Sequence, residues 1–481
     1  MAYEYFGKNI RPFTAICGCN FGRQIIYTNK SAITKANIVE ELNKALVIHN
    51  QNAKEIEYLD RYYRGDQPIL YRKKVNRPEV NNKIVMNLAY ELVERKTAEI
   101  CAEPIQYVLR GTDNAKSEQI TELNVTMDSE SKQEVDIDIC RWRSICGTAY
   151  RFIGNDEADG LLDESDFALF SENPIYTFVV YFSNGRPAFS CQIREGENGE
   201  TIYFCYTRGE WFEITDGKVA RSGKNGNGAI PVIEYPNNAR RISDIEITLP
   251  ITDAINTLCS DRINGIEQFV SSWVRFVNCE IDKETFRAMR QEGALVVKSN
   301  NGENKADVDI LSQELNQTEG QVVFDDLFEK FLSIQGLANR QGNTGGDTQG
   351  AVNLRNGHYD AGLRTAINEP ILKKSERMSL KIILNRLRIK RGFTLMPSEI
   401  EIHINHNKLD NMLVKAEVLQ ILLNSGVYYK RAIKTVDMFS DPEQVATESK
   451  KRMELLYPEE VKEEVKQKEE INNIVETKTV E

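Results

Sequence analysis

The sequence lacks any apolar run that approaches the roughly 20 residues needed to span a bilayer. Its first residues, MAYEYFGKNIRPF, lack the apolar core of a signal peptide. A surplus of basic residues is also lacking, because the formal net charge is −11 over 481 residues. That balance argues against a conventional basic nucleic-acid-binding protein. From these absences we expect a soluble protein that is made in the cytoplasm and has no membrane contact.

Closely spaced cysteines are almost absent. The nine cysteines are scattered, and only Cys17 and Cys19 are close together, which is weak evidence for a metal. The pattern predicts reduced thiols in a cytosolic setting.

The glycine-rich stretch SGKNGNGAIP has no Gly-Lys-Ser/Thr ending and no helix directly after it, so we expect a surface loop there. We therefore predict no cofactor, no metal site and no catalytic residue.

What is present suits a globular protein with real cores, since hydrophobic residues make up 41% and charged residues 28%. The length indicates about three domains. Residues 1–33 have no strong period, and we expect an arm that orders only against a partner. Helical spacing predicts helices from Thr34, which is a plausible cap, then from Asn82 to Cys101 and from Lys132 to Cys146.

Residues 148–235 change character. Short runs rich in aromatic and β-branched residues, such as IYTFVVYF and TIYFCYT, alternate with the turn dipeptides Asn184-Gly185 and Asp216-Gly217. This pattern predicts an antiparallel β region.

The next part predicts two helices that carry a small module between them. A helix is expected from Asp244 or Pro250 to Trp273, and a second one over 321–335. Residues 274–320, with strands in RFVNCEI, ALVVK and DVDILSQEL and a short helix over 283–291, lie between them. The arrangement indicates a stalk that carries a tip.

A loop of about fifteen residues, ANRQGNTGGDTQGAV, follows the second helix over 338–352. Loops of this length inside compact domains are uncommon and are usually functional or disordered. The chain continues in a long helical segment over 353–391, which Pro370 should kink. A strand is expected over 399–405 and further helices from Lys408, while the charged tail after Pro458 should be frayed or disordered.

Two carboxylate pairs offer an enzymatic alternative. Asp136/Asp138 or Asp307/Asp309 would bind Mg²⁺ in a nucleic-acid-processing enzyme. Because Asp136 and Asp138 diverge around a helix, a solvated face is the better interpretation for them. His403 and His406 fall on opposite faces of a strand, which favours a structural role over a metal site.

Three stretches resemble the portal proteins of tailed bacteriophages of Gram-positive hosts. The first is EIEYLDRYYRGDQPIL followed by NNKIVMNLAYELVERKTAEICAEPIQY. The second and most specific is IPVIEYPNN followed by SDIEITLPITDAINTLCSDRINGIEQF, which is similar to the family's entry into its first stem helix. The third is GDTQGAVNLR, which leads into the long helix as the family's tunnel loop leads into its spine helix.

The resemblance implies an α+β portal fold with a mixed α/β wing, a two-helix stem, a small α/β clip, a long kinked spine helix and a helical crown. It assigns the arm to 1–33, the wing to 34–243 and 392–407, the stem to 244–273 and 321–335, the clip to 274–320, the tunnel loop to 336–352, the spine helix to 353–391, the crown to 408–458 and the charged tail to 459–481.

The implied function is a structural ring of about twelve subunits at one capsid vertex of the virion, first assembled in the host cytoplasm. Double-stranded DNA would pass through its channel during packaging and ejection. Partners would be terminase, head–tail connector or adaptor proteins, and the major capsid and scaffold proteins. The implied channel residues of the tunnel loop are Asn339, Arg340, Gln341, Asn343, Thr344, Asp347, Thr348 and Gln349, with hinge or kink positions at Gly336, Gly350 and Pro370.

Overall fold

The computed structural model describes residues 4–5, 8–9, 22–75, 78–111, 113–155, 165–270, 273–277, 284, 287, 307–311, 317–337, 358–404, 412–436, 439, 445–446 and 448–452. In chain order the elements are β1 (Glu4–Tyr5), β2 (Lys8–Asn9), β3 (Ile26–Thr28), α1 (Ile38–Tyr63), the 3-10 helix η2 (Pro68–Tyr71), α2 (Leu88–Cys101), β4 (Gln106–Leu109), α3 (Asn114–Ser129), α4 (Lys132–Cys146), β5 (Thr148–Asn155), β6 (Phe167–Glu172), β7 (Thr177–Phe182), β8 (Pro187–Glu195), β9 (Thr201–Tyr206), β10 (Glu210–Thr215), β11 (Lys218–Lys224), β12 (Val232–Pro236), α5 (Asp244–Val270), β13 (Trp273–Val277), β14 (Asp307–Leu311), α7 (Gln317–Gln335), α9 (His358–Arg391), β15 (Ile400–His403), α10 (Met412–Asn424) and α11 (Tyr429–Val436).

The chain forms two compact units, and it passes from one to the other several times. Unit 1 comprises Met1–Lys96, Asp138–Phe152 and Phe170–Met378. Unit 2 comprises Thr97–Ile137, Ile153–Leu169 and Ser379–Glu481. Helices and sheets occur together, so the predicted α+β class is confirmed.

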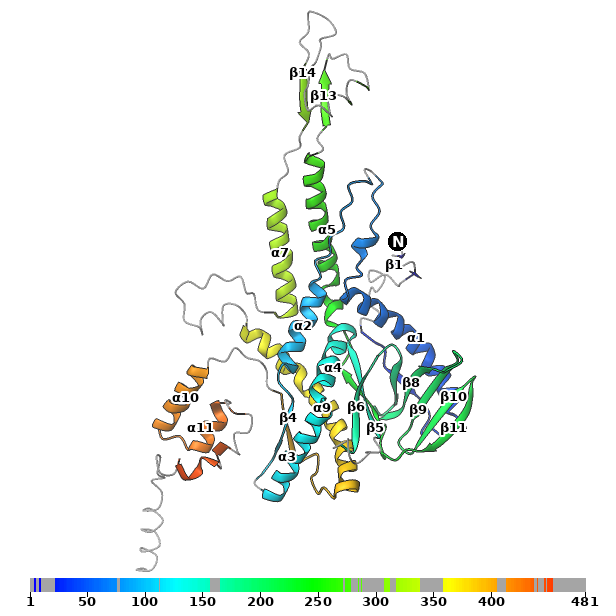
Figure 1. Cartoon of the computed structure of the whole chain (residues 1–481), viewed down its shortest axis with the longest axis vertical. Helices are drawn as coiled ribbons and strands as arrows, with labels where there is room; N and C mark the ends of the chain where they lie inside the picture. Colours follow the sequence, from blue (N-terminus) through cyan, green and yellow to red (C-terminus); the bar gives the residue numbers. More distant parts are fainter. Residues whose placement is uncertain are drawn as a thin grey trace, which may run out of the picture. The chain divides into compact units, whose positions relative to one another are not determined.

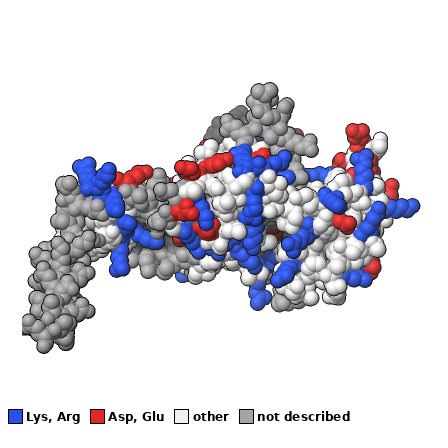
Figure 2. Space-filling model, turned by 90° about the horizontal axis from the view of Figure 1, so that it is seen from below, with Lys and Arg blue, Asp and Glu red and all other residues white. Residues whose placement is uncertain are grey.

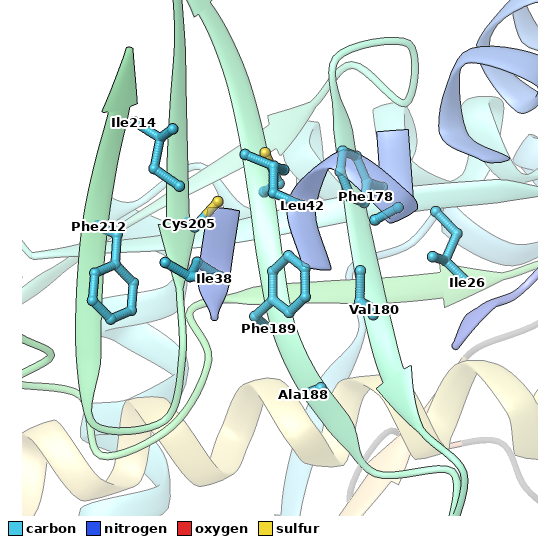
Figure 3. Packing of buried hydrophobic residues seen from close by; sticks show 12 residues of the cluster. Ile26, Ile38, Leu42, Phe178, Val180, Ala188, Phe189, Cys205, Phe212 and Ile214 are labelled. Atoms are coloured by element: carbon cyan, nitrogen blue, oxygen red, sulfur yellow. The ribbon is translucent and has the colours of Figure 1, made fainter. Parts of the chain in front are cut away.

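Unit 1 contains a six-stranded sheet in the order β11-β10-β9-β8-β7-β3. Hairpins join the antiparallel strands, and Asp216 and Gly217 both have positive φ at the predicted turn. One face of the sheet packs on α1, because alternate side chains of a strand point to the same side. Figure 3 shows this core, which is built from Ile26, Ile38, Leu42, Ala45, Phe178, Val180, Ala188, Phe189, Cys191, Cys205, Phe212 and Ile214.

The amino-terminal segment differs from the prediction of an arm. Residues 22–33 belong to unit 1, and β3 pairs in parallel with β7, with Ile26 opposite Val180. Arg23 is buried and forms an ion pair with Glu246 in α5. The pairing partners lie far along the chain, so the segment orders against its own subunit.

The second helix begins later than predicted, at Leu88 and not at Asn82. Residues 82–86 run beside α5, and side chains of that helix accept hydrogen bonds from their backbone N–H groups. At α1 the N-cap is Asn37, and Thr34 contributes its carbonyl oxygen to the turn before the helix.

Helices α5 and α7 form an antiparallel hairpin in unit 1 (Figure 1). Between their ends the chain carries β13 and β14, which pair antiparallel with Val277 opposite Asp307.

Helix α5 runs on through Pro250, and α9 runs on through Pro370. Neither proline ends its helix, while a kink at Pro370 stays a prediction. The predicted strand in ALVVK and most of the predicted helix over 283–291 lie outside the described residues.

Unit 2 contains α3, the two-stranded sheet of β15 and β4, the C-terminal half of α9 and the helices α10 and α11. Gly426, with a φ of 80°, separates α10 from α11. Their small core is made of Leu423, Tyr429, Ala432, Ile433 and Ala446.

Basic side chains are prominent in one view of the described residues. Figure 2 shows Lys and Arg side chains gathered on the face seen from below, although the net charge of the chain is −11. The last turn of α9 contributes Arg388, Lys390 and Arg391 to the basic side chains of unit 2. Arg391 is partly neutralised by Glu122 at 2.9 Å and Asp166 at 2.7 Å.

Candidate functional site at the base of the helical hairpin

The residues that the sequence suggested for the DNA channel lie outside the described residues. These are Asn339, Arg340, Gln341, Asn343, Thr344, Asp347, Thr348 and Gln349, together with Gly350. What the structure describes are the two ends from which this loop departs, the end of α7 with Gly336 and the following helix α9. The geometry of these ends decides how firmly the loop is anchored.

Helix α7 ends in a left-handed glycine cap. Gly336 has a φ of 67°, a conformation that side chains disfavour and glycine adopts freely. Its N–H donates to the carbonyl oxygen of Ser333 at 3.2 Å, and the N–H of Leu337 donates to that of Leu332 at 2.9 Å. These two bonds define a Schellman motif. Leu332 and Leu337 then meet in one apolar cluster, so the chain leaves the helix in a fixed direction.

Gln335 fastens the end of α7 to the start of α5. Its amide nitrogen donates to the carbonyl oxygen of Asp244 at 2.7 Å and to the hydroxyl of Thr248 at 2.8 Å. The side chain is only 5% exposed, so both bonds form away from water. These two bonds join the end of α7 to the start of α5, one residue before Gly336.

An apolar seam holds the two helices together above this closure. Phe331 and Leu332 of α7 pack with Ile255 of α5 and with Leu88 and Leu92 of α2. Along α7 the rings of Phe324, Phe328 and Phe331 are stacked, with centroid separations of 6.1 and 6.4 Å. Spacings of three and four residues place these side chains on one face of the helix.

A polar ladder occupies another face of α5. The N–H groups of Asn82, Ile84 and Met86 donate to the side chains of Asn264, Ser260 and Asn256 at 2.7, 2.9 and 2.7 Å, in that order. Every second residue of the extended segment pairs with every fourth residue of α5. Two extended residues span about 6.6 Å and four helical residues about 6.0 Å, so the spacings of donors and acceptors match. Sequence reasoning missed this contact. The signal was three buried polar residues, Asn256, Ser260 and Asn264, spaced by four along one face of the helix.

On the other side of the loop, α9 is anchored to unit 1 by buried charge. Arg151 of β5 donates to both carboxylate oxygens of Glu376 at 3.1 and 2.9 Å, and the hydroxyl of Tyr235 donates to the same carboxylate at 2.8 Å. The hydroxyl of Ser375 donates to the carbonyl oxygen of Glu234 at 2.8 Å. The helix that follows the loop is thus attached to unit 1 at Ser375 and Glu376.

Glu234 itself belongs to a buried ion-pair network. Burial alone raises the pKa of this carboxyl group, but the Arg241 guanidinium and the hydrogen bonds from Tyr181 and Thr148 outweigh that effect and lower it. The Glu234–Arg241 pair therefore stays charged. It connects β12 to Thr148 and Tyr181 on the neighbouring strands.

The carboxylates considered for Mg²⁺ are placed differently from the expectation. Asp136 is buried, not solvated, because it forms an i,i+4 ion pair with Lys132, itself only 3% exposed. Asp307 and Asp309 lie on β14, opposite Val277 and Arg275. Among the residues that the structure describes, no three histidine, cysteine or acidic side chains are grouped so that they could hold a metal ion. His403 ends β15, and His406 lies outside the described residues.

The comparison with protein families decides the identity. Residues 42–473 match the family described as phage portal protein, SPP1 Gp6-like. The chain belongs to this family. Among solved structures it is similar to a chain from the neck of an empty GTA particle, with 10% sequence identity and a TM-score of 0.43, over 70% of this chain and 85% of that one. No curated protein matches the sequence.

This phage portal protein is therefore a structural component of the virion, which works as an oligomeric ring in association with the capsid and the tail connector. None of its described helices is long and apolar enough to cross a membrane. The six cysteines in the described part of the chain are free thiols, in agreement with the prediction.

Proposed function

We propose that about twelve copies of this chain form a closed ring at one capsid vertex, with DNA passing through the central channel during packaging and ejection. The ring assembles in the host cytoplasm before it joins the head. The observation that carries the proposal is the family match over 42–473, which includes both helices of the hairpin and the loop after them.

The parts of the subunit take the roles that the resemblance implied. Residues 244–273 and 321–335 form the stem, and the module over 274–320 is the clip, which docks first the terminase and later the head–tail connector proteins. Residues 34–243 and 392–407 form the wing, 353–391 the spine helix and 408–458 the crown. The antiparallel arrangement of α5 and α7, with β13 and β14 between them in the chain, supports the assignment of stem and clip.

The tunnel loop over 336–352 faces the DNA in this proposal. A channel must let DNA slide, and each phosphate held by a basic side chain adds salt-sensitive affinity that would act as a brake. The loop carries only Arg340 and Asp347 as charged residues, so it is close to neutral. Its amides and hydroxyls offer weak contacts that exchange quickly. The firm anchor at Gln335 and Gly336 supports a loop that resists being dragged along with the DNA.

Deletion of residues 342–350 tests this role. The shortened protein should still form rings, but particles assembled with it should package or retain less DNA. A variant in which the same residues are replaced by a Gly/Ser segment of equal length separates the effect of loop length from that of its amides. Rings that fail to form would show that the loop is a packing element between subunits, and normal packaging by the deletion variant would contradict a role in the channel.

A further inference from the structure

A short basic loop stands out beside α5. Residues 71–75, here called the basic loop, read YRKKV and begin at the last residue of η2. Arg72 and Lys74 both form ion pairs with Asp261 of α5, at 3.1 and 3.3 Å, so the two cations share one carboxylate. Lys73 is exposed, and the described structure provides no ion pair for it. Val75 is 95% exposed. Removing an apolar side chain of this kind from water would lower the free energy.

Hydrogen bonds hold the start of the basic loop. The amide of Asn81 donates to the carbonyl oxygen of Arg72 at 3.1 Å, and the ammonium of Lys83 donates to that of Leu70 at 2.6 Å. The polar ladder then fastens the returning segment to α5. The described part of the loop thus offers an exposed cation, Lys73, and an exposed apolar side chain, Val75, for contact with a partner.

A complementary surface lies on α7. Its 19 residues include four acidic side chains and one basic side chain. Val322, Asp326 and Glu329, spaced by four and three, share the face that points away from the Phe324–Phe328–Phe331 stack, and we call them the outer face of α7. Val322 is 63% exposed, and the described structure shows no ion pair for either carboxylate.

The end of the outer face that begins at Val322 lies near the level of the basic loop, on the opposite side of α5. The basic loop contacts Asp261, and the next residue, Arg262, donates to Gln321 at the start of α7 at 3.1 Å. Figure 1 shows the loop on one side of α5 and α7 on the other. A ring requires this kind of arrangement, because each subunit must present one surface to the subunit before it and a different surface to the subunit after it.

We infer that the basic loop of one subunit docks on the outer face of α7 in the next copy of this chain. The inference rests on the proposed ring and takes the hairpin to run along the rotation axis, so that rotation brings the basic loop of one subunit to the start of α7 in the next. Lys73 then approaches Asp326 and Glu329, and Val75 covers Val322. Opposite charges favour this pairing over contact between like surfaces.

Cysteine cross-linking tests the contact. In Lys73→Cys combined with Asp326→Cys, mild oxidation of the purified ring should give a ladder of linked subunits on a non-reducing gel. Each single variant measures the background from the nine native cysteines. Lys73→Cys with Lys218→Cys, an exposed position on β11, is the matched control and should give no ladder.

A charge swap provides the second readout. Lys73→Glu or Asp326→Lys alone should raise the concentration at which half of the subunits are in rings by roughly twofold to fivefold, and the combined swap should restore it. Rings that form normally but give neither a ladder nor this rescue would overturn the inference and leave the proposed function intact. A wild-type chain that forms no ring would overturn both.

Discussion

Arg151 and Glu376 are separated by 225 positions in the sequence, yet they form an ion pair in which each side chain is only 1% exposed. Arg151 comes from β5 and Glu376 from α9. The hydroxyl of Tyr235 on β12 joins the pair, and the Arg151 guanidinium lies 4.8 Å from the centre of its ring. The spine helix of the proposed portal subunit is therefore attached to strands β5 and β12 through buried charge.

Replacing Glu376 by Gln should destabilise the subunit strongly. The substitution keeps the shape but leaves the Arg151 cation buried without its counter-charge, which costs roughly 3–5 kcal/mol in comparable sites. The matched control is Glu369→Gln on the same helix. Glu369 forms an ion pair with Lys373, and both side chains are partly exposed. That change should cost less than about 1 kcal/mol. Equilibrium unfolding in urea measures both values, and equal costs would contradict this account of the anchor.

Gly336→Ala should lower the free energy of unfolding by roughly 1–2 kcal/mol, because a left-handed φ of 67° is strained for a residue with a β-carbon. Gly336→Asn should cost less, since asparagine tolerates this conformation at a helix end. Thermal unfolding of the two variants side by side provides the measurement. An alanine variant as stable as the wild type would mean that the cap does not fix the start of the loop.

Ser260→Ala removes the acceptor for the Ile84 N–H, a bond of 2.9 Å. A buried donor that loses its partner costs about 1–3 kcal/mol, so denaturant unfolding should show a loss in that range. Thr257→Ala lies one turn away on the exposed side of the same helix and should stay within about 0.5 kcal/mol of the wild type. If both variants behaved alike, the polar ladder would contribute nothing to stability.

His49 makes the stability of unit 1 depend on pH. Burial lowers the pKa of its imidazole to about 4, against an ordinary value of 6.5, although the ring nitrogen bonds the carbonyl oxygen of Ile175 at 2.9 Å. The unfolded chain therefore binds the proton more readily, and the contribution to stability is complete above pH 6.5 and is lost as the pH falls toward 4. The expected loss is roughly 3 kcal/mol.

Unfolding curves recorded between pH 7 and pH 4 for wild type, His49→Phe and His403→Gln test this expectation. The slope should shrink in the phenylalanine variant, whose ring can still stack on Phe178, and should remain in the glutamine variant. A wild-type slope that survives in His49→Phe would assign the pH dependence to other groups.

Local patterns predicted the elements whose cause is local. Short runs rich in aromatic and β-branched residues predicted the strands from β5 to β10, and helical spacing predicted α4 with its observed bounds, Lys132–Cys146. In each case the period of the element is visible within about ten residues of sequence.

The failures have causes far along the chain. Residues 82–87 have a helical pattern, but their N–H groups bond Asn256, Ser260 and Asn264, more than 160 residues later. Residues 26–28 join a parallel pair with β7, whose register no local signal reveals. Asp136 resembled a solvated residue because burial of its partner Lys132 depends on tertiary packing. The roles of the tunnel-loop residues stay predictions, since they depend on DNA and on neighbouring subunits.

The most direct test of the central claim is the native mass of the purified protein, with electron micrographs of the same fraction. The account predicts a closed ring of about twelve subunits with an open centre. A chain that remains monomeric, or that forms a small compact oligomer without a central channel, would contradict it.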